Sequence, residues 1–169
     1  ELGVHTAILA DLQGPKIRIG NFKNSSVILK DNQKFILDLN SKLGDEKRVL
    51  LPHPEIFKSV KKNNKILIDD GKVLLNVESV SSTQISAEVI NGGKVSNKKG
   101  VNIPETFIKM SSLTKKDIKD LELCVNLSLD YVALSFVQKS KDLIDLKKYT
   151  GDQTAIMAKF EKPLAIRRM

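Results

Sequence analysis

The sequence predicts an α/β unit combined with an all-β unit, in which a small antiparallel β-barrel domain is inserted after a parallel strand. Three observations support this fold class. Residues 4–12 are nearly all apolar, as in a parallel strand that is buried on both faces. Residues 27–103 carry short β-prone runs at spacings of roughly 8–12 residues. After Pro104 the pattern changes to helix, strand, helix, strand.

The first predicted strand, residues 4–12, ends in polar sequence. Asp11 emerges at its carboxyl end, and Gln13-Gly14-Pro15 follows. Gly-Pro marks a turn at which the chain leaves the strand. Loops after parallel strands tolerate insertions and carry functional residues, so a β domain that begins here explains the order of the elements.

The β-prone runs of the middle stretch are VILK, KFILDL, RVLL, KILID, VLLNVESV and TQISAEVI. Turn signals separate them, at Asp69-Asp70-Gly71-Lys72 and at Asn91-Gly92-Gly93-Lys94. Short strands with such turns are typical of a small antiparallel barrel or sandwich. One or two helical turns are expected at residues 53–60, where Pro54 suits a first helical position.

A helix of about three turns is predicted after residue 113. Thr114 and Asp117 have the spacing of a capping box, in which each residue bonds the backbone N–H of the other. Ile118, Leu121 and Val125 then repeat at helical spacing and give the helix one apolar face.

Strand, helix and strand follow as a βαβ unit with parallel strands. The strands are expected at residues 130–136 and 154–160, and Ser140 can cap the helix between them. Gly151 can end that helix. Its predicted buried face carries Leu143, Leu146 and Tyr149.

The composition of the 169 residues is that of a globular protein, with 41% hydrophobic and 28% charged residues. The longest apolar run, residues 131–137, is too short to cross a bilayer. No charged-then-apolar leader precedes Val4, and the single Cys124 cannot form an intrachain disulfide. These features predict a soluble, cytoplasmic protein without a membrane partner.

The formal net charge of +8 is compatible with nucleic acid, an anionic membrane or a phosphorylated small molecule as partner. Modules for single-stranded nucleic acid interleave basic residues with exposed aromatics, whereas aromatic residues are only 5% here and Trp is absent. An ordinary solvated surface without nucleic acid is therefore favoured. A basic β-barrel module that binds nucleic acid is the alternative, and its binding would depend strongly on salt.

Polar residues end three of the predicted parallel strands. Asp11 lies at the end of the first strand, Ser135 at the end of the second, and Lys159 with Glu161 at the end of the third. The carboxyl ends of parallel strands form the active face of barrels, so these groups have a reason to converge. Alternation along a strand aims Lys159 and Glu161 to the same side, where they could hold an anionic substrate and a cation. Strand termination and a simple ion pair are the alternative explanations.

Two further segments carry cations beside flexible backbone. Arg18 follows the Gly-Pro turn, and Lys98-Lys99-Gly100 follows the Gly92-Gly93 signal as a candidate phosphate clamp. Surface lysines without a function are the alternative. The sequence contains no Walker loop, no GxGxxG motif and no Cys/His set with metal-ligand spacing, so it gives no support to nucleophilic catalysis.

Together, five segments resemble the pyruvate kinase family in order and spacing. ADLQGPKIRIG is similar to the family's strand-exit motif LDTKGPEIRTG, and the other segments are ILIDDGKV with NGGKVSNKKGVNIP, LTKKDIKDL, LDYVALSFVQ and IMAKFEKPLAI. The resemblance covers nearly the whole chain. It implies phosphoryl transfer from phosphoenolpyruvate to ADP in glycolysis, with Mg²⁺ or Mn²⁺, in a homotetrameric parent enzyme whose β domain closes as a lid.

The resemblance also implies roles for the strand-end residues. Lys159 matches the lysine that stabilises charge on the transferring phosphoryl group. Glu161 matches a ligand of the divalent ion, and Asp11 matches a contributor to a monovalent-cation site. Ser135 matches the serine of the substrate pocket.

Arg18 and Lys99 match positions that hold nucleotide phosphates. Lys16 stands where potassium-dependent members have Glu, so the resemblance suggests an ammonium that substitutes for K⁺. The other departures from the family pattern are Leu12, Gln13 and Gln138.

A complete (β/α)8 barrel needs roughly 200 residues or more, so we expect this chain to form only part of such a barrel. The expected division is residues 1–12 and 108–169 in the catalytic barrel and residues 13–107 in the lid. We expect the chain alone to be inactive. An interaction scaffold with exposed strand edges is the remaining alternative.

Overall fold

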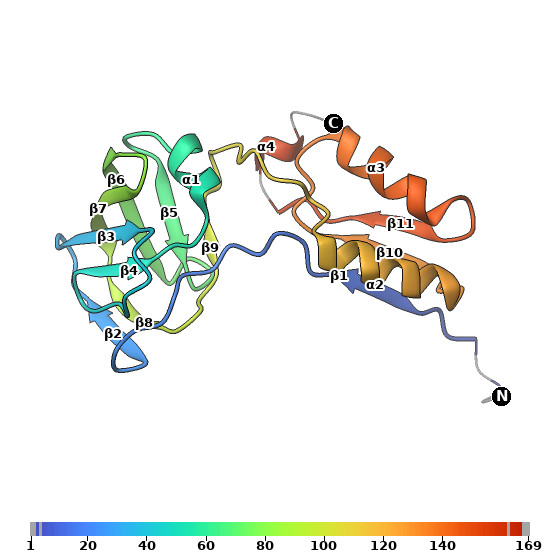
Figure 1. The fold of residues 1–169 in the computed structure, drawn as a ribbon, viewed down its shortest axis with the longest axis horizontal. Coiled ribbons are helices and arrows are strands. Elements are labelled where there is room, and N and C mark those ends of the chain that lie inside the picture. Colours follow the sequence, from blue (N-terminus) through green and yellow to red (C-terminus); the bar gives the residue numbers. More distant parts are fainter. Residues whose placement is uncertain (1–2, 4, 162, 167–169) are drawn as a thin grey trace. The chain divides into compact units, whose positions relative to one another are not determined.

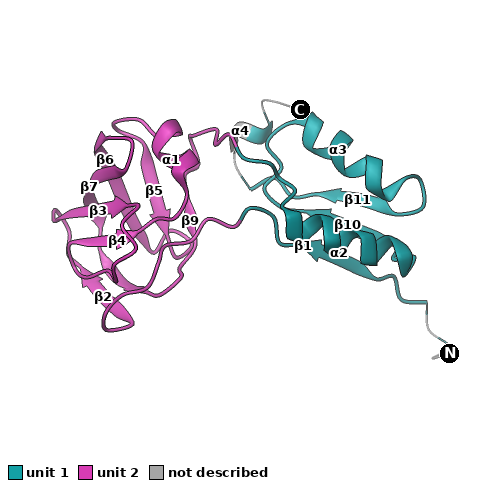
Figure 2. Cartoon of the chain, viewed as in Figure 1, with its two compact units in different colours: residues 1–15, 110–169 teal, residues 16–109 magenta. Residues whose placement is uncertain are grey.

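The computed structural model describes Gly3, residues 5–161 and residues 163–166. The chain divides into two compact units (Figure 2). Residues 1–15 together with residues 110–169 form unit 1, and residues 16–109 form unit 2. Unit 2 therefore interrupts unit 1 in the sequence.

Three parallel strands form the sheet of unit 1, in the order β1-β10-β11 (Figure 1). Their bounds are Leu9–Leu12 for β1, Tyr131–Leu134 for β10 and Ala155–Ala158 for β11. The predicted parallel pairing is confirmed. The first strand is shorter than the predicted residues 4–12, because its partner β10 begins at Tyr131, opposite Leu9. Val4 lies outside the described residues.

The helices of unit 1 are α2 (Lys115–Asn126), α3 (Ser140–Thr150) and the single turn α4 (Pro163–Ile166). The predicted capping box of α2 is confirmed: Thr114 Oγ1 accepts from Asp117 N at 3.1 Å, and Asp117 Oδ2 accepts from Thr114 N at 2.8 Å. Gly151 ends α3 with a φ of +56°, as predicted.

The predicted cap of α3 is wrong. Ser140 is the first helical residue, and Lys139 occupies the capping position. Instead of a serine hydroxyl, the Asp142 carboxylate accepts hydrogen bonds from the backbone amides at the start of the helix, from Gln138 N at 2.9 Å and from Lys139 N at 3.2 Å. A single carboxylate oxygen, Asp142 Oδ2, accepts from both amides.

One face of the unit 1 sheet packs against apolar side chains of α2 and α3. The core includes Leu12, Val132 and Leu134 from the sheet, and Leu121, Cys124 and Leu146 from the helices. The opposite face is not covered, since Leu9, Tyr131 and Met157 are 40%, 41% and 48% exposed. The prediction that the parallel strands are buried on both faces is therefore wrong for this chain. Tyr149, also predicted to be buried, is 42% exposed.

Unit 2 is the predicted all-β domain, a β-barrel domain built from a curled six-stranded sheet and a two-stranded ribbon (Figure 1). The sheet order is β4-β3-β7-β6-β5-β9, and β2 pairs with β8. The bounds are Ser26–Leu29 for β2, Lys34–Asp38 for β3, Arg48–Leu50 for β4, Lys65–Ile68 for β5, Val73–Val80 for β6, Gln84–Asn91 for β7, Gly93–Ser96 for β8 and Val101–Asn102 for β9.

Among the strands of unit 2 the pairing is antiparallel except between β3 and β4, which are parallel, and an isolated bridge between Phe22 and Gly44 is parallel as well. Residues 39–47 return the chain toward the start of β3, so Arg48 pairs opposite Ile36. The prediction of a uniformly antiparallel barrel is therefore wrong for the pair of strands β3 and β4. Helix α1 (Pro54–Ser59) begins at Pro54, as predicted.

One predicted turn of unit 2 is confirmed and the other is wrong. Lys72 N donates to the Asp69 carbonyl at 3.1 Å between β5 and β6, and Asp69 and Asp70 adopt φ of +54° and +56°. Gly92 instead joins β7 directly to β8. A Cβ there would lie 2.3 Å from the Leu29 carbonyl oxygen, so glycine is required by the close approach of β2.

The core of unit 2 is apolar and closed. Fully buried side chains come from alternate positions of its strands: Phe35, Leu37, Val49, Ile66, Ile68, Leu75, Val77, Ile85, Ala87 and Val89. This alternation is the period-two pattern expected of strands with one face on a core. In the described part of the chain, no helix has both the length and the apolar character needed to cross a bilayer.

Candidate active site

The carboxyl ends of the unit 1 strands bring four predicted residues together. Lys159 Nζ lies 3.0 and 2.9 Å from the two carboxylate oxygens of Asp11. The same ammonium lies 3.9 Å from Glu161 Oε1. Ser135 Oγ lies 3.3 Å from Asp11 Oδ1. One cation therefore stands between two carboxylates, one from each outer strand of the sheet.

Parallel pairing explains why these residues meet. The β1-β10-β11 register aligns Leu12 with Leu134 and Leu134 with Ala158, so the residues that follow each strand emerge at one edge. Lys159 N also donates to the Leu134 carbonyl at 3.0 Å, which continues the ladder to the site. The side chains of Lys159 and Glu161 are 35% and 33% exposed, so water and ligands can reach them.

Ser135 is the buried member of this cluster, at 4% exposure. Its hydroxyl lies 2.9 Å from the Leu12 carbonyl oxygen, which ties the end of β10 to the end of β1. Phe136 follows with a φ of +57°, a conformation that costs energy for a bulky side chain. Strain of this kind concentrates at functional sites, which supports a functional role for this edge.

The Gly14 turn fits against the strained segment. Its φ is +65°, and a Cβ there would lie 3.0 Å from a ring carbon of Phe136. Gly14 N donates to Asp117 Oδ1 at 3.1 Å, and the Asp117 carboxylate is fully buried. Asp117 thus anchors the exit of β1 to the start of α2. The sequence indicated its capping role, but nothing in the sequence signalled this second contact.

Each carboxylate of the site could serve as one ligand of a metal ion, but the carboxylates do not form a complete metal site together. Mg²⁺ is commonly bound by one or two carboxylates plus substrate phosphate oxygens, and the partly exposed Glu161 carboxylate suits that use. Among the described residues, no three His, Cys, Asp or Glu side chains lie close enough to hold an ion by themselves. At Asp11, the Lys159 ammonium already contacts both oxygens, so a monovalent cation would share that carboxylate with it.

The predicted phosphate-binding residues lie on neighbouring segments of unit 2. Arg18 bridges Gly100, and Ile19 N donates to the Lys99 carbonyl at 3.0 Å. The two side chains make different contacts, however. Arg18 Nη1 donates to the Lys98 carbonyl at 2.7 Å, whereas Lys99 Nζ lies 2.9 Å from Asp69 Oδ1. Lys16 is exposed and is the first residue of unit 2.

Asp69 holds Lys99 from the tight turn before β6. Its other oxygen lies 3.2 Å from Lys72 Nζ, and the ammonium groups of Lys99 and Lys72 lower the pKa of Asp69 below its usual range. Lys99 is 36% exposed at its side chain, against 71% for Lys72. The sequence explained Asp69 by the turn, and its contact with Lys99 was not predicted because Lys99 lies thirty positions away in the chain.

Comparison with known proteins identifies the family. The family model described as pyruvate kinase, barrel domain, matches residues 1–169. The pyruvate kinase of Methylorubrum extorquens is 43% identical over 162 residues, which is 96% of this chain and 34% of that protein. A pyruvate kinase of Agrobacterium vitis is 43% identical over 98% of this chain and 35% of its own length.

A pyruvate kinase of Buchnera aphidicola is 40% identical over 98% of this chain and 36% of its own length. The chain thus spans about a third of the length of the relatives that it matches. Because the family model and the relatives cover nearly all of its residues, the chain belongs to the pyruvate kinase family.

Proposed function

We propose that the parent enzyme of this chain transfers the phosphoryl group of phosphoenolpyruvate to ADP, giving pyruvate and ATP. The observation that carries this proposal is the Lys159 ammonium, held between the Asp11 and Glu161 carboxylates at the carboxyl edge of a parallel sheet. The names of the relatives support the reaction class. Phosphoryl transfer needs few covalent steps from the protein, and it depends on positioning and on charge stabilisation.

In this proposal Lys159 stabilises the negative charge that spreads over the transferring phosphoryl oxygens. Asp11 orients the ammonium through two contacts, at 2.9 and 3.0 Å. Ser135 would hold the Asp11 carboxylate, 3.3 Å from its hydroxyl, and would form part of the substrate pocket. A preorganised cation of this kind contributes roughly 10²–10³ to the rate of comparable reactions.

Glu161 would hold Mg²⁺ or Mn²⁺ as one protein ligand. When bound, the ion would neutralise charge on the substrate oxygens. Its remaining ligands would come from substrate and from parts of the parent enzyme outside this chain. The absence of three clustered ligands among the described residues is consistent with such a shared site.

In unit 2, Arg18 and Lys99 would contact the phosphates of ADP and ATP. Arg18 offers a planar fork for phosphate oxygens, and the Asp69 contact keeps Lys99 in one position until a phosphate competes for it. Lys16 would supply a fixed charge in place of K⁺. The parent enzyme would then be active without a monovalent cation, as a cytoplasmic homotetramer.

We further infer that unit 1 is part of a (β/α)8 barrel, into which residues 13–107 are inserted as a lid. The exposed face of its sheet supports this, because Leu9, Tyr131 and Met157 form the apolar layer that a barrel interior requires. A polypeptide of residues 13–107 should then unfold cooperatively and give a β-type circular dichroism spectrum. A featureless spectrum would contradict an independent lid.

The alternative of a basic nucleic-acid module is less well supported. Residues 16–109 are all described, and their aromatic side chains Phe22, Phe35 and Phe57 are buried, while Phe107 is half-buried. Single-stranded nucleic acid binds to exposed aromatic rings on which its bases stack. Unit 2 therefore presents no fully exposed aromatic ring for stacking.

The test uses a full-length enzyme in which residues 1–169 replace the matching third of the Methylorubrum extorquens relative. Pyruvate formation from phosphoenolpyruvate and ADP is coupled to lactate dehydrogenase and measured at increasing Mg²⁺. We expect turnover, and we expect Glu161→Gln to raise the Mg²⁺ concentration needed for half-maximal rate. Glu122→Gln removes an exposed carboxylate from α2 and serves as the matched control.

Two results would contradict the proposal. One is a folded full-length enzyme, verified by circular dichroism, that does not turn over phosphoenolpyruvate. The other is an identical Mg²⁺ dependence for Glu161→Gln and Glu122→Gln.

A further inference from the structure

Asp117 is a buried carboxylate whose contacts go beyond the cap of its own helix. It stands at the third position of α2, and its side chain is fully buried. Its Oδ2 accepts hydrogen bonds from Thr114 N at 2.8 Å and from Thr114 Oγ1 at 2.6 Å, and these contacts belong to the capping box. Its second oxygen, Oδ1, accepts from Gly14 N at 3.1 Å, 103 positions away in the chain.

The corresponding carboxylate of α3 shows what a cap requires. Asp142 stands at the same position of its helix, is also buried, and accepts from Gln138 N and Lys139 N. Both donors lie within four positions of it in the chain. The contact of Asp117 with Gly14 is therefore an addition to the cap, and it ties the segment that leaves β1 to the start of α2.

The turn at Gly14 is held from a second side by the end of β10. A Cβ on Gly14 would lie 3.0 Å from a ring carbon of Phe136 and 3.4 Å from Ser135 Cβ, so the turn already fits closely against both residues. Ser135 Oγ also lies 2.9 Å from the Leu12 carbonyl oxygen. The backbone after β1 is thus fixed between β10 on one side and Asp117 on the other.

This backbone decides where the Asp11 carboxylate stands. The side chain of Asp11 is 54% exposed, so packing does not fix it. It nevertheless lies 3.3 Å from Ser135 Oγ and 2.9 and 3.0 Å from Lys159 Nζ. An exposed side chain keeps such contacts when its backbone is held, and Ser135 and Asp117 hold the three residues that follow Asp11.

We propose that Asp117 is a positioning residue for phosphoryl transfer: through the Gly14 turn it holds Asp11, and through Asp11 it holds the Lys159 ammonium. This inference rests on the proposed function, in which Lys159 stabilises the transferring phosphoryl group. Because Asp117 is fully buried, it acts only through these other residues. A misplacement of about 1 Å caused by a change far from the chemistry can lower a rate by about 10²-fold.

The test compares kcat among variants of the full-length enzyme that carries residues 1–169. Asp117→Asn keeps the size of the side chain, but an amide has one accepting oxygen and a donating NH₂ group. It cannot accept from both Gly14 and Thr114. We expect kcat to fall about 10- to 100-fold. The KM for ADP should stay unchanged, because the proposed nucleotide contacts, Arg18 and Lys99, belong to unit 2.

Thr114→Val is the matched control within the same capping box. It removes the hydroxyl that Asp117 N donates to, and it leaves the Asp117 carboxylate free to accept from Gly14 N. Both variants should lower the temperature of unfolding, since both weaken the cap of α2. Only Asp117→Asn should lower kcat, because only that change releases the Gly14 turn.

A double-mutant cycle with Lys159→Met separates positioning from general damage to the fold. If Asp117 acts through the ammonium, Asp117→Asn should lower kcat no further once Lys159 is methionine. Gly14→Ala displaces the same turn from its other side, and it takes the place of Asp117→Asn if that variant does not fold. It should likewise lower kcat, and only while the ammonium is present.

Three results overturn the inference. The first is a folded Asp117→Asn or Gly14→Ala enzyme with unchanged kcat, measured where Lys159→Met does lower kcat. The second is an equal loss of kcat in Thr114→Val and Asp117→Asn, and the third is a loss that multiplies with that of Lys159→Met. A folded Lys159→Met enzyme with unchanged kcat overturns the proposed function itself, and this inference with it.

Discussion

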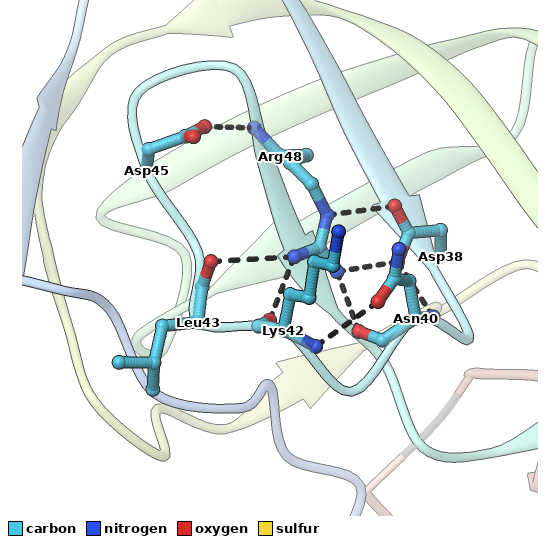
Figure 3. Close-up of polar contacts among 6 residues, drawn as sticks. All are labelled: Asp38, Asn40, Lys42, Leu43, Asp45 and Arg48. Carbon is cyan, nitrogen blue, oxygen red and sulfur yellow. Dashed lines mark hydrogen bonds and ion pairs between the residues drawn. The ribbon is translucent and has the colours of Figure 1, made fainter.

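Replacing Arg48 by methionine should destabilise unit 2 by about 3 kcal/mol, because it removes one partner of a nearly buried ion pair. The partner is Asp38, whose two carboxylate oxygens lie 2.8 and 2.5 Å from Arg48 Nε and Nη2 (Figure 3). The side chains of Arg48 and Asp38 are only 17% and 15% exposed. Breaking a fully buried pair costs about 3–5 kcal/mol, and the partial access of water to Asp38 brings this case to the lower end. Three backbone carbonyls, of Asn40, Lys42 and Leu43, lose their donor too, but water can replace it.

Urea unfolding of the 169-residue chain measures this cost, followed by the NMR amide signals of Leu37 and Val49 in the core of unit 2. Lys47→Met is the control, since it removes an exposed neighbouring charge. The double variant Arg48→Met with Asp38→Leu should recover part of the loss, because no buried charge is then left without a partner. If Arg48→Met unfolds within about 0.5 kcal/mol of Lys47→Met, the reasoning about this ion pair is refuted.

Three further predictions follow from the site and from the titrating groups. The 169-residue chain alone should show no turnover of phosphoenolpyruvate and ADP above a Lys159→Met control in the coupled assay, because it spans only about a third of the length of its relatives and water screens its partly exposed strand-end charges; turnover above that control would contradict this. The full-length enzyme should work with Na⁺ or tetramethylammonium in place of K⁺, because in the proposed function Lys16 would supply the charge; an activity that only K⁺ restores would exclude this role of Lys16. Acidification should destabilise unit 2, because burial lowers the pKa of His53 below its usual 6.5, so the unfolded chain takes up the proton first and stability falls as pH drops below that value. Asp69, whose pKa is lowered from 3.8 by Lys99, adds a second loss at still lower pH. Thermal unfolding over a pH series measures both steps, and His53→Gln should flatten the first; an unchanged pH dependence in that variant would count against the assignment.

Much of the fold could be predicted because its signals are local. The capping box of Thr114 and Asp117, the turn at Asp69 and the first helical Pro54 are each decided by residues within one turn of the chain. The parallel pairing of β10 and β11 followed from the helix between two apolar runs.

The errors lie where distant segments decide the structure. Gly92 signals a turn by itself, yet β2 passes so close that the chain continues directly into β8. The strand residues Leu9 and Met157 are apolar as in a doubly covered sheet, but within unit 1 only one face is covered. Pairing of β3 with β4 depends on the return path of residues 39–47, which no local pattern encodes.

In the candidate site, too, local patterns could be predicted from the sequence, whereas contacts between distant residues could not. Lys159 and Glu161 were predicted to share one side from strand alternation alone, and they lie 3.9 Å apart. The closer partner of Lys159 is Asp11, which is 148 positions away in the chain, and sequence spacing cannot reveal such a contact. The contact between Asp117 and Gly14 was missed for the same reason.

The central claim, that the Lys159 ammonium promotes phosphoryl transfer, is tested most directly by the kcat of one variant in the full-length enzyme. Lys159→Met keeps the length of the side chain and removes the charge, and Lys141→Met removes an exposed charge of α3 as the control. The account predicts that Lys159→Met lowers kcat by roughly 10²–10³, whereas Lys141→Met leaves kcat unchanged. A folded Lys159→Met enzyme with a kcat equal to that of the control would contradict it.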